Sequence, residues 1–149
     1  MKKLLCSLFA LSAVSTAMAQ EVNIKLLGTS DIHGRVVPWS YGADVEDKSG
    51  SYAQIATYVK DVRKNNKNVV LVDVGDAIQD NQVDVFAKDK KYYKDHPIPK
   101  VLNEMKYDVF VLGNHEFNFG MKALDEILKD IKAKKLTANF YYKKNDKRY

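Results

Sequence analysis

Residues 69–76 have the sequence VVLVDVGD, an almost continuous aliphatic run that ends in a glycine and an aspartate. A run this short, rich in valine and followed by a turn residue, is typical of a strand that is buried on both faces. Similar runs occur at residues 24–28, 109–112 and 136–140. The sequence therefore predicts four short strands inside a hydrophobic core.

Helical patterns separate these four strands. Apolar residues follow i, i+3, i+4 or i+7 spacing over residues 52–62, 98–105 and 124–131. Pro97 and Pro99 suit the first turn of the second helix. The order βαβαβαβ predicts an α/β fold with right-handed crossovers and a largely parallel sheet.

Two polar stretches, residues 35–51 and 79–96, do not fit this alternation and are expected to be long loops with room for a short helix. Loops of this length in a compact domain are more often functional than idle. Arg35, Trp39 and Tyr41 lie in the first stretch. They either line a substrate cleft or face solvent, and the sequence leaves both interpretations open.

The composition is that of a folded chain with a mild charge bias. Of the 149 residues, 46% are hydrophobic and 29% are charged, and the formal net charge is +5. This apolar fraction excludes an intrinsically disordered chain, and the small numbers of glycine and proline exclude collagen-like repeats. The basic residues form no stripe interleaved with aromatic residues, so a nucleic-acid polymer is not an expected partner. The sequence indicates no oligomeric state.

Residues 1–19 have the organisation of a signal peptide. Two lysines precede an apolar run, and Ala17-Met18-Ala19 is a small-x-small site that a signal peptidase accepts. The apolar run is shorter than the roughly 20 residues that cross a bilayer, so cleavage is expected and a stable membrane anchor is not. Residues 20–149 would then form a periplasmic or secreted protein.

Cleavage would remove Cys6, the only cysteine of the chain. Disulfides, thiolate metal ligands and a cysteine nucleophile are therefore excluded from residues 20–149. Any metal ion in this part of the protein must be held by oxygen and nitrogen atoms.

Polar side chains follow three of the predicted strands. Asp31 and His33 follow the first strand, Asp76 follows the second, and Asn114 and His115 follow the third. Because the carboxyl ends of parallel strands meet at one edge of a sheet, these side chains are expected to lie together. Asp31 and His33 would project from the same side of an extended segment. Two carboxylates, one amide and two imidazoles suit a divalent metal such as zinc, manganese or iron.

Each of these groups taken singly also suits a turn or a helix cap. Their joint occurrence after three successive strands favours the metal site. Three further acidic residues are interpreted as supporting, strand-edge or cap residues without a chemical role, namely Asp73, Asp108 and Glu116.

The three polar endings resemble the first motifs of a known family. Asp31-x-His33, Gly75-Asp76 and Gly113-Asn114-His115-Glu116 are similar in order and spacing to those of the calcineurin-like metallophosphoesterases. More narrowly, the chain resembles exported 5′-nucleotidases and 2′,3′-cyclic-nucleotide 2′-phosphodiesterase/3′-nucleotidases. The segments that carry this narrower resemblance are TSDIHG (29–34), VDVGDAIQ (72–79), LGNHEFNFG (112–120) and TAN (137–139).

The resemblance implies a four-layer α-β-β-α sandwich, of which the βαβαβαβ order would be the N-terminal part. It also implies two divalent metal ions, zinc, manganese, iron or cobalt, about 3.5–4 Å apart, with a bridging hydroxide that attacks the phosphorus. Asp31 and His33 would bind the first ion, and Asp76 would bridge both. Asn114 would bind the second ion. His115 would not be a ligand but would protonate the leaving oxygen or stabilise the transferring phosphoryl group.

The implied function is a metal-dependent phosphoester hydrolase that acts on nucleotides outside the cytoplasm and takes part in nucleotide catabolism. Its substrates would be 2′,3′-cyclic nucleotides and 3′- or 5′-nucleotides. Two segments favour the cyclic phosphodiesterase/3′-nucleotidase branch: Asn118-Phe119-Gly120, which follows the Gly-Asn-His-Glu motif, and His96-Pro97, which begins the helix before it. The alternative is a non-catalytic exported fragment that binds a metal or a nucleotide.

The chain departs from the family pattern in its histidines. The later family motifs include a Gly-His-x-His, whereas this chain has only His33, His96 and His115. His96 is expected at the surface or at a helix start. The chain is therefore expected to be an incomplete N-terminal part, inactive by itself, with one face of its sheet uncovered.

Overall fold

The computed structural model describes residues 21–138, 140–142 and 147–148. The signal peptide expected at residues 1–19 and the residue Asn139 lie outside the described residues. Within the described part, no helix combines the length and apolarity that a membrane span requires. The elements in chain order are β1 (Lys25–Thr29), β2 (Trp39–Ser40), β3 (Val45–Glu46), α1 (Tyr52–Asn65), β4 (Val69–Asp73), α2 (Asp84–Lys88), η1 (Lys90–Asp95), α3 (Pro97–Glu104), β5 (Val109–Val111), η2 (His115–Phe117), α4 (Met121–Lys129), β6 (Lys134–Leu136), β7 (Tyr141–Tyr142) and β8 (Lys147–Arg148).

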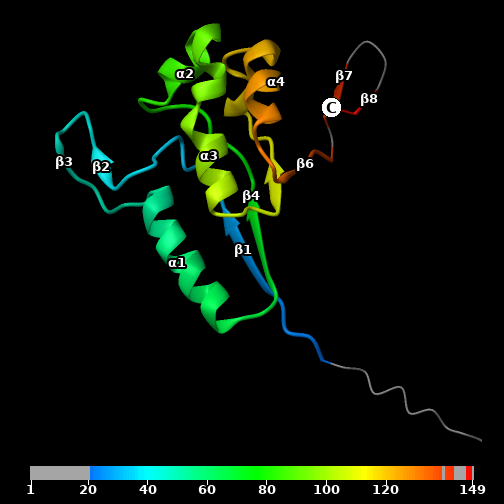
Figure 1. Cartoon of the computed structure of the whole chain (residues 1–149). Coiled ribbons are helices and arrows are strands. Elements are labelled where there is room, and N and C mark those ends of the chain that lie inside the picture. Colours follow the sequence, from blue (N-terminus) through cyan, green and yellow to red (C-terminus); the bar gives the residue numbers. More distant parts are fainter. Residues whose placement is uncertain (1–20, 139, 143–146, 149) are drawn as a thin grey trace, which may run out of the picture.

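Four strands form one parallel sheet in the order β1-β4-β5-β6. Figure 1 shows β1 and β4 side by side, with α1 and α3 next to them. Leu71 of β4 and Phe110 of β5 are buried in the core, where they join Leu102 of α3 and Leu124 of α4. The predicted α/β fold with a parallel sheet is confirmed.

The opposite face of this sheet has little cover from the described residues. Because side chains alternate along a strand, Leu26 lies on the other face from Leu27. Leu26 is 71% exposed and Leu136, which pairs with Val111, is 46% exposed. Within the described residues, the expectation of one uncovered sheet face is confirmed. Right-handed crossovers between successive neighbouring strands place all the helices on the same face, and this explains the asymmetry.

The local sequence explains where the helices begin. Ser51 precedes α1, and its hydroxyl accepts a hydrogen bond from the N–H of Gln54. Pro97 and Pro99 lie in the first turn of α3, where no N–H partner is needed. Gly120 precedes α4 with a φ of 82°. All three helices occur within a few residues of their predicted positions.

The fourth strand differs from its prediction. The strand β6 spans Lys134–Leu136 rather than residues 136–140. Lys134 pairs with Val109 at the edge of the sheet, and the ammonium group of Lys135 donates to the carbonyl oxygen of Ile131. An edge strand needs little burial, and lysines on such a strand disfavour pairing with another chain. Apolarity was therefore the wrong signal for this strand.

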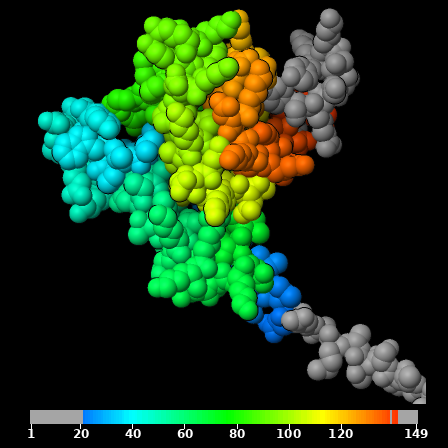
Figure 2. Space-filling view, viewed as in Figure 1, coloured from blue at the N-terminus to red at the C-terminus, as the bar shows by residue number. Residues whose placement is uncertain are grey.

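Both predicted loops contain secondary structure. Residues 35–51 include the antiparallel hairpin of β2 and β3, in which Trp39 lies opposite Glu46. Residues 79–96 contain α2 and η1, in agreement with the expected short helix. Figure 2 shows the hairpin, in cyan, as a lobe at one side of the molecule.

Two backbone hydrogen bonds join the loop after β1 to the loop after β4. The N–H of Asp31 donates to the carbonyl of Gly75 at 3.1 Å, and the N–H of His33 donates to the carbonyl of Asp76 at 2.9 Å. Asp31, His33 and Asp76 have φ angles of 55°, 49° and 57°. The extended segment predicted for residues 31–33 is therefore wrong. The chain turns there through the left-handed region, which Asp and His tolerate better than most residues.

The loops after β4 and β5 approach so closely that only glycine fits between them. A Cβ atom at Gly75, whose φ is 103°, would overlap the backbone nitrogen of Gly113. A Cβ atom at Gly113 would overlap the carboxylate of Asp76. The Gly-Asp and Gly-Asn-His-Glu motifs thus lie backbone against backbone.

The buried carboxylate of Glu116 fastens these two loops together. Its Oε2 accepts hydrogen bonds of 2.7 Å from the N–H groups of both Asp76 and Gly113. Its Oε1 accepts from the N–H groups of Ala77 at 2.7 Å and Ile78 at 3.3 Å. These charge-assisted hydrogen bonds offset the cost of burying the carboxylate. Sequence analysis left Glu116 as a possible cap and missed this role.

Buried His96 caps the start of α3. Its Nδ1 accepts the N–H of Ile98 at 3.3 Å, so Nε2 carries the hydrogen and donates to the carbonyl of Ile78 at 3.1 Å. Of the two expected placements, the helix start is confirmed and the surface is wrong. Burial lowers the pKa of His96 to about 4. Protonation would also turn Nδ1 into a donor that faces the N–H of Ile98.

The substitution Glu116→Gln is expected to lower the free energy of unfolding by about 2–3 kcal/mol, because the amide NH₂ presents donors to N–H groups that need an acceptor. Urea denaturation followed by circular dichroism measures this change. Exposed Glu104 of α3 provides the matched control, since Glu104→Gln should change stability by less than about 0.5 kcal/mol. Equal stabilities of the two variants would contradict the role of Glu116.

His96 is also expected to make the fold sensitive to acid. Its folded pKa of about 4 lies below the ordinary value near 6.5, so its contribution to stability is complete above pH 6.5 and is lost as the pH falls through 4. The substitution His96→Asn keeps a capping oxygen but does not titrate. As the pH falls from roughly 7.5 to 4, the free energy of unfolding of this variant should rise by about 3 kcal/mol relative to that of the wild type.

Urea denaturation of both proteins at these two pH values measures the effect. Burial raises the pKa of Asp73 to about 6, so acidification stabilises the fold through Asp73. This opposite contribution is common to both proteins and cancels in their difference. A stability difference that does not change with pH would contradict the prediction.

Candidate functional site

Asp31, His33 and Asp76 come together at the carboxyl ends of β1 and β4. One donor atom from each lies within 4.8 Å of the others. Asp76 is buried, His33 is half-buried and Asp31 is exposed. The Nε2 atom of His33 lies 3.9 Å from Oδ1 of Asp31, which is too long for a hydrogen bond. The structure therefore gathers three of the four predicted ligands into one cluster.

The atoms of this cluster fit a divalent cation. The Nδ1 atom of His33 is buried and has no hydrogen-bond partner within the described part of the chain. Its nearest carboxylate oxygen, on Asp80, is 3.9 Å away. No lysine or arginine of the described residues forms an ion pair with Asp31 or Asp76. Two carboxylates without a lysine or arginine partner, beside an imidazole with one unpartnered nitrogen, are a donor set that suits zinc, manganese or iron.

The loop after β5 carries the other two predicted site residues and brings His115 to this cluster. The N–H of His115 donates to Oδ1 of Asp76 at 2.7 Å. The rings of His115 and His33 lie 5.1 Å apart in an edge-to-face arrangement. Asn114 directly precedes His115 and is exposed, and its amide forms no hydrogen bond with the described residues. Its carbonyl oxygen is therefore available to a ligand.

Gln79 and Asn118 orient the imidazole of His115. The Nδ1 atom of His115 lies 2.8 Å from Oε1 of Gln79, and the amide of Asn118 donates to the same oxygen at 2.5 Å. Because a carbonyl oxygen only accepts, Nδ1 of His115 carries the hydrogen and Nε2 is left for a ligand. Sequence analysis missed Gln79, although the segment VDVGDAIQ (72–79) contains it.

Asp73 and Asp108 support the strands. The carboxylate of Asp73 accepts hydrogen bonds from the hydroxyl of Thr29 at 2.7 Å and from the N–H of Gly75 at 3.0 Å. Asp108 accepts from the N–H of Leu71 at 2.8 Å. Burial raises the pKa of Asp73, and the hydroxyl of Thr29 partly opposes this rise. The contacts of Asp73 agree with the supporting role interpreted from the sequence, and Asp108 lies at the edge of β5, as interpreted.

Comparison with known proteins identifies relatives that share these motifs. Residues 24–148 match the sequence model of the family "Calcineurin-like phosphoesterase". The trifunctional nucleotide phosphoesterase protein YfkN of Bacillus subtilis (strain 168) is 37% identical over 139 residues, which are 88% of this chain and 9% of YfkN. The crystal structure of calcineurin-like phosphoesterase YfkN superposes with a TM-score of 0.76 at 36% identity and covers 85% of this chain and 40% of that chain.

Two further relatives have names that refer to nucleotides. The 2′,3′-cyclic-nucleotide 2′-phosphodiesterase/3′-nucleotidase of Haemophilus influenzae is 35% identical over 89% of this chain and 21% of that protein. The 5′-nucleotidase of Homo sapiens is 33% identical over 89% of this chain and 23% of that protein. This chain thus spans less than a quarter of the length of these curated relatives. The resemblance based on the three motifs is confirmed: the chain belongs to the calcineurin-like phosphoesterase family.

Proposed function

We propose that the protein is a metal-dependent phosphoester hydrolase that acts on nucleotides. The observation that carries this proposal is the cluster of Asp31, His33 and Asp76 beside the ring of His115. Its substrate class would be 2′,3′-cyclic nucleotides and 3′- or 5′-nucleotides. The names of the relatives from Haemophilus influenzae and Homo sapiens support this class.

Asp31 and His33 would hold a first divalent ion, Asp76 would lie between two ions, and Asn114 would offer its carbonyl oxygen to the second. The ligand atoms are oxygen and nitrogen, so zinc, manganese, iron and cobalt are the candidate metals. When bound, such ions lower the pKa of a water molecule that serves as the nucleophile, and they neutralise phosphate charge. The chain itself supplies the orientation of the ligands and of the imidazole.

With a hydrogen on both ring nitrogens, His115 would donate a proton or a hydrogen bond from Nε2 to the leaving oxygen or the phosphoryl group. The hydrogen bond from Nδ1 to Gln79 supports this assignment because it leaves Nε2 as the free ring nitrogen. The backbone N–H of His115 also donates to Asp76, so the backbone that carries the imidazole is fixed to this carboxylate. A positioned acid of this kind contributes typically 10²–10⁴-fold to the rate.

The composition of residues 1–19 supports export, so the proposed location is periplasmic or secreted.

A second candidate function is a non-catalytic metal- or nucleotide-binding module. The ligand count favours this candidate, because among the described residues only Asp76 and Asn114 are assigned to a second ion. Two protein ligands are few for an ion that usually has four or more.

Calorimetric titration of the purified chain with Mn²⁺ is expected to show one weakly bound ion, and Asp76→Ala should abolish its uptake because the buried ligand is lost. Asp61 of α1 is exposed and does not belong to the metal cluster, so Asp61→Ala serves as the control and should retain uptake. No uptake by the unsubstituted chain, or equal uptake by Asp76→Ala, would overturn the metal site.

In the full-length protein, His115→Ala is expected to slow hydrolysis of 2′,3′-cyclic AMP and 3′-AMP about 10²–10³-fold. Phosphate release measures the rate, and elemental analysis measures the metal content, which should stay unchanged. A parallel loss of metal would show that His115 is a ligand. Hydrolysis of 5′-AMP alone would contradict the substrate branch, and metal uptake without any hydrolysis would favour the binding module.

A further inference from the structure

The imidazole of His33 has a carboxylate near each of its two nitrogens. Its Nε2 lies 3.9 Å from Oδ1 of Asp31, inside the metal cluster. Its Nδ1 lies 3.9 Å from Oδ2 of Asp80, an aspartate that does not belong to the cluster. Both distances are too long for hydrogen bonds. The ring therefore connects the cluster to the loop that follows β4.

The Nδ1 atom of His33 needs an acceptor once Nε2 serves as a metal ligand. A neutral imidazole binds a cation through one nitrogen, and its hydrogen is then on the other. Histidine ligands almost always donate this second N–H to a carboxylate, a backbone carbonyl or a water molecule. Nδ1 of His33 is buried and has no partner among the residues that the structure describes. A buried N–H without an acceptor is costly, so this atom calls for a partner.

Asp80 can supply the acceptor. Its backbone is fixed, because its N–H donates to Oδ1 of Asp84 at the start of α2, at 2.7 Å. Its side chain is 69% exposed, and its carboxylate forms no hydrogen bond with the described residues. A shift of Oδ2 by about 1 Å, which rotation of an exposed side chain supplies, would bring it within hydrogen-bond distance of Nδ1 of His33.

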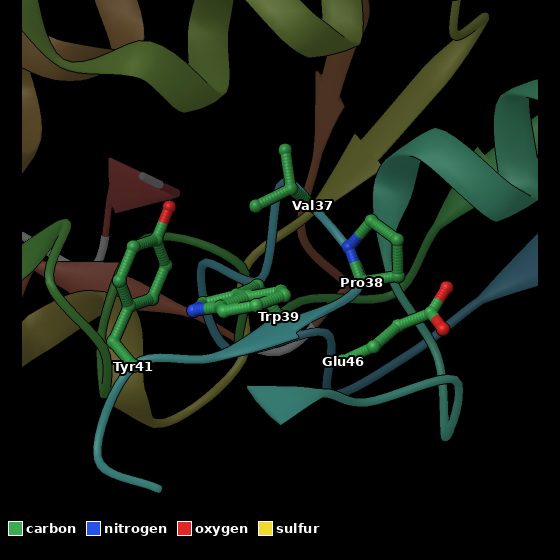
Figure 3. Close-up of a pocket in the computed structure, with 5 residues that line it drawn as sticks. All are labelled: Val37, Pro38, Trp39, Tyr41 and Glu46. Atoms are coloured by element: carbon green, nitrogen blue, oxygen red, sulfur yellow. The ribbon is translucent and has the colours of Figure 1, made fainter. Parts of the chain in front are cut away.

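Two carboxylates of the hairpin region that follows His33 have basic partners instead. Asp47 forms an ion pair with Arg35 at 3.0 Å. Glu46 pairs with Lys48 at 3.4 Å, and Figure 3 shows its side chain in an open groove of the β2–β3 hairpin. The loop after β4, in contrast, brings to Nδ1 a carboxylate that has no lysine or arginine partner within the described part of the chain.

We propose that Asp80 positions His33 for metal binding. Its carboxylate accepts the hydrogen of Nδ1, which fixes the tautomer of the ring and leaves the lone pair of Nε2 for the cation. Asp80 is a positioning residue rather than a ligand, since it lies outside the group of side chains that can share one ion. The inference rests on the proposed function, because it takes His33 as a metal ligand. It deepens that function by a residue that belongs to none of the three motifs.

The tautomer of His33 tests this role without any metal. At about pH 8.5 and in EDTA, nitrogen NMR of the chain with isotope-labelled histidine separates neutral rings that carry hydrogen on Nδ1 from those that carry it on Nε2. Asp80→Gly removes the carboxylate and keeps the backbone, since glycine adopts the φ of 82° without strain. The ratio of the Nδ1–H form to the Nε2–H form of His33 should then fall about 2–10-fold, as expected for one lost hydrogen bond.

Two further variants separate positioning from other effects. Asp44 is an exposed aspartate with a φ of 53° and lies outside the metal cluster, so Asp44→Gly is the matched control and should leave the ratio unchanged. Asp80→Asn keeps an oxygen that accepts the hydrogen of Nδ1 but removes the charge. This conservative variant should keep most of the Nδ1–H form.

Calorimetric titration with Mn²⁺ measures the consequence for metal binding. Asp80→Gly should bind Mn²⁺ about 10–100-fold more weakly than the unsubstituted chain, and Asp80→Asn should restore most of this affinity. Asp44→Gly should bind like the unsubstituted chain.

An unchanged tautomer ratio in Asp80→Gly would overturn the positioning role. Equal losses of affinity in Asp80→Gly and Asp80→Asn would also overturn it, because they would show an effect of charge alone. Absence of Mn²⁺ uptake by the unsubstituted chain would instead overturn the proposed metal site. The tautomer measurement contains no metal, so it would still decide whether Asp80 orients the ring of His33.

Discussion

The hydrogen bonds to the buried carboxylate of Glu116 are the interaction on which the candidate site depends. One oxygen accepts the N–H groups of Asp76 and Gly113 together, so the loops after β4 and β5 share a single anion. Loss of that anion would leave buried donors without acceptors on both loops. Because Gly75 and Gly113 are already in backbone contact, the loops have no room for another arrangement. The left-handed turn at Asp76 and the position of its carboxylate follow from this packing.

The site that these loops form concentrates negative charge. Asp31 and Asp76 bring two carboxylates to one edge of the sheet, and no lysine or arginine of the described residues pairs with either. Like charges held close together oppose folding, and a bound cation would reverse this effect and stabilise the native state by mass action.

Local patterns predicted most of the fold, and they failed where burial or backbone geometry departed from the simple rules. The strands β1, β4 and β5 and the three long helices follow directly from apolar spacing. The edge strand β6 carries lysines, so apolarity placed it too late in the chain. The segment from Asp31 to His33 was expected to be extended, but two backbone hydrogen bonds to Gly75 and Asp76 hold it in a left-handed turn.

The sequence by itself determined the α/β order, the family and the side chains that gather at the strand ends, because strand runs, helical spacing and short motifs are local properties of the chain. Only the tertiary structure decided the roles of Glu116 and Gln79. Glu116 acts on Asp76 across 40 residues of chain, and Gln79 acts on His115 across 36. Hydrogen bonds over such separations form only after the parallel sheet has brought the strand ends together, and no local pattern encodes them.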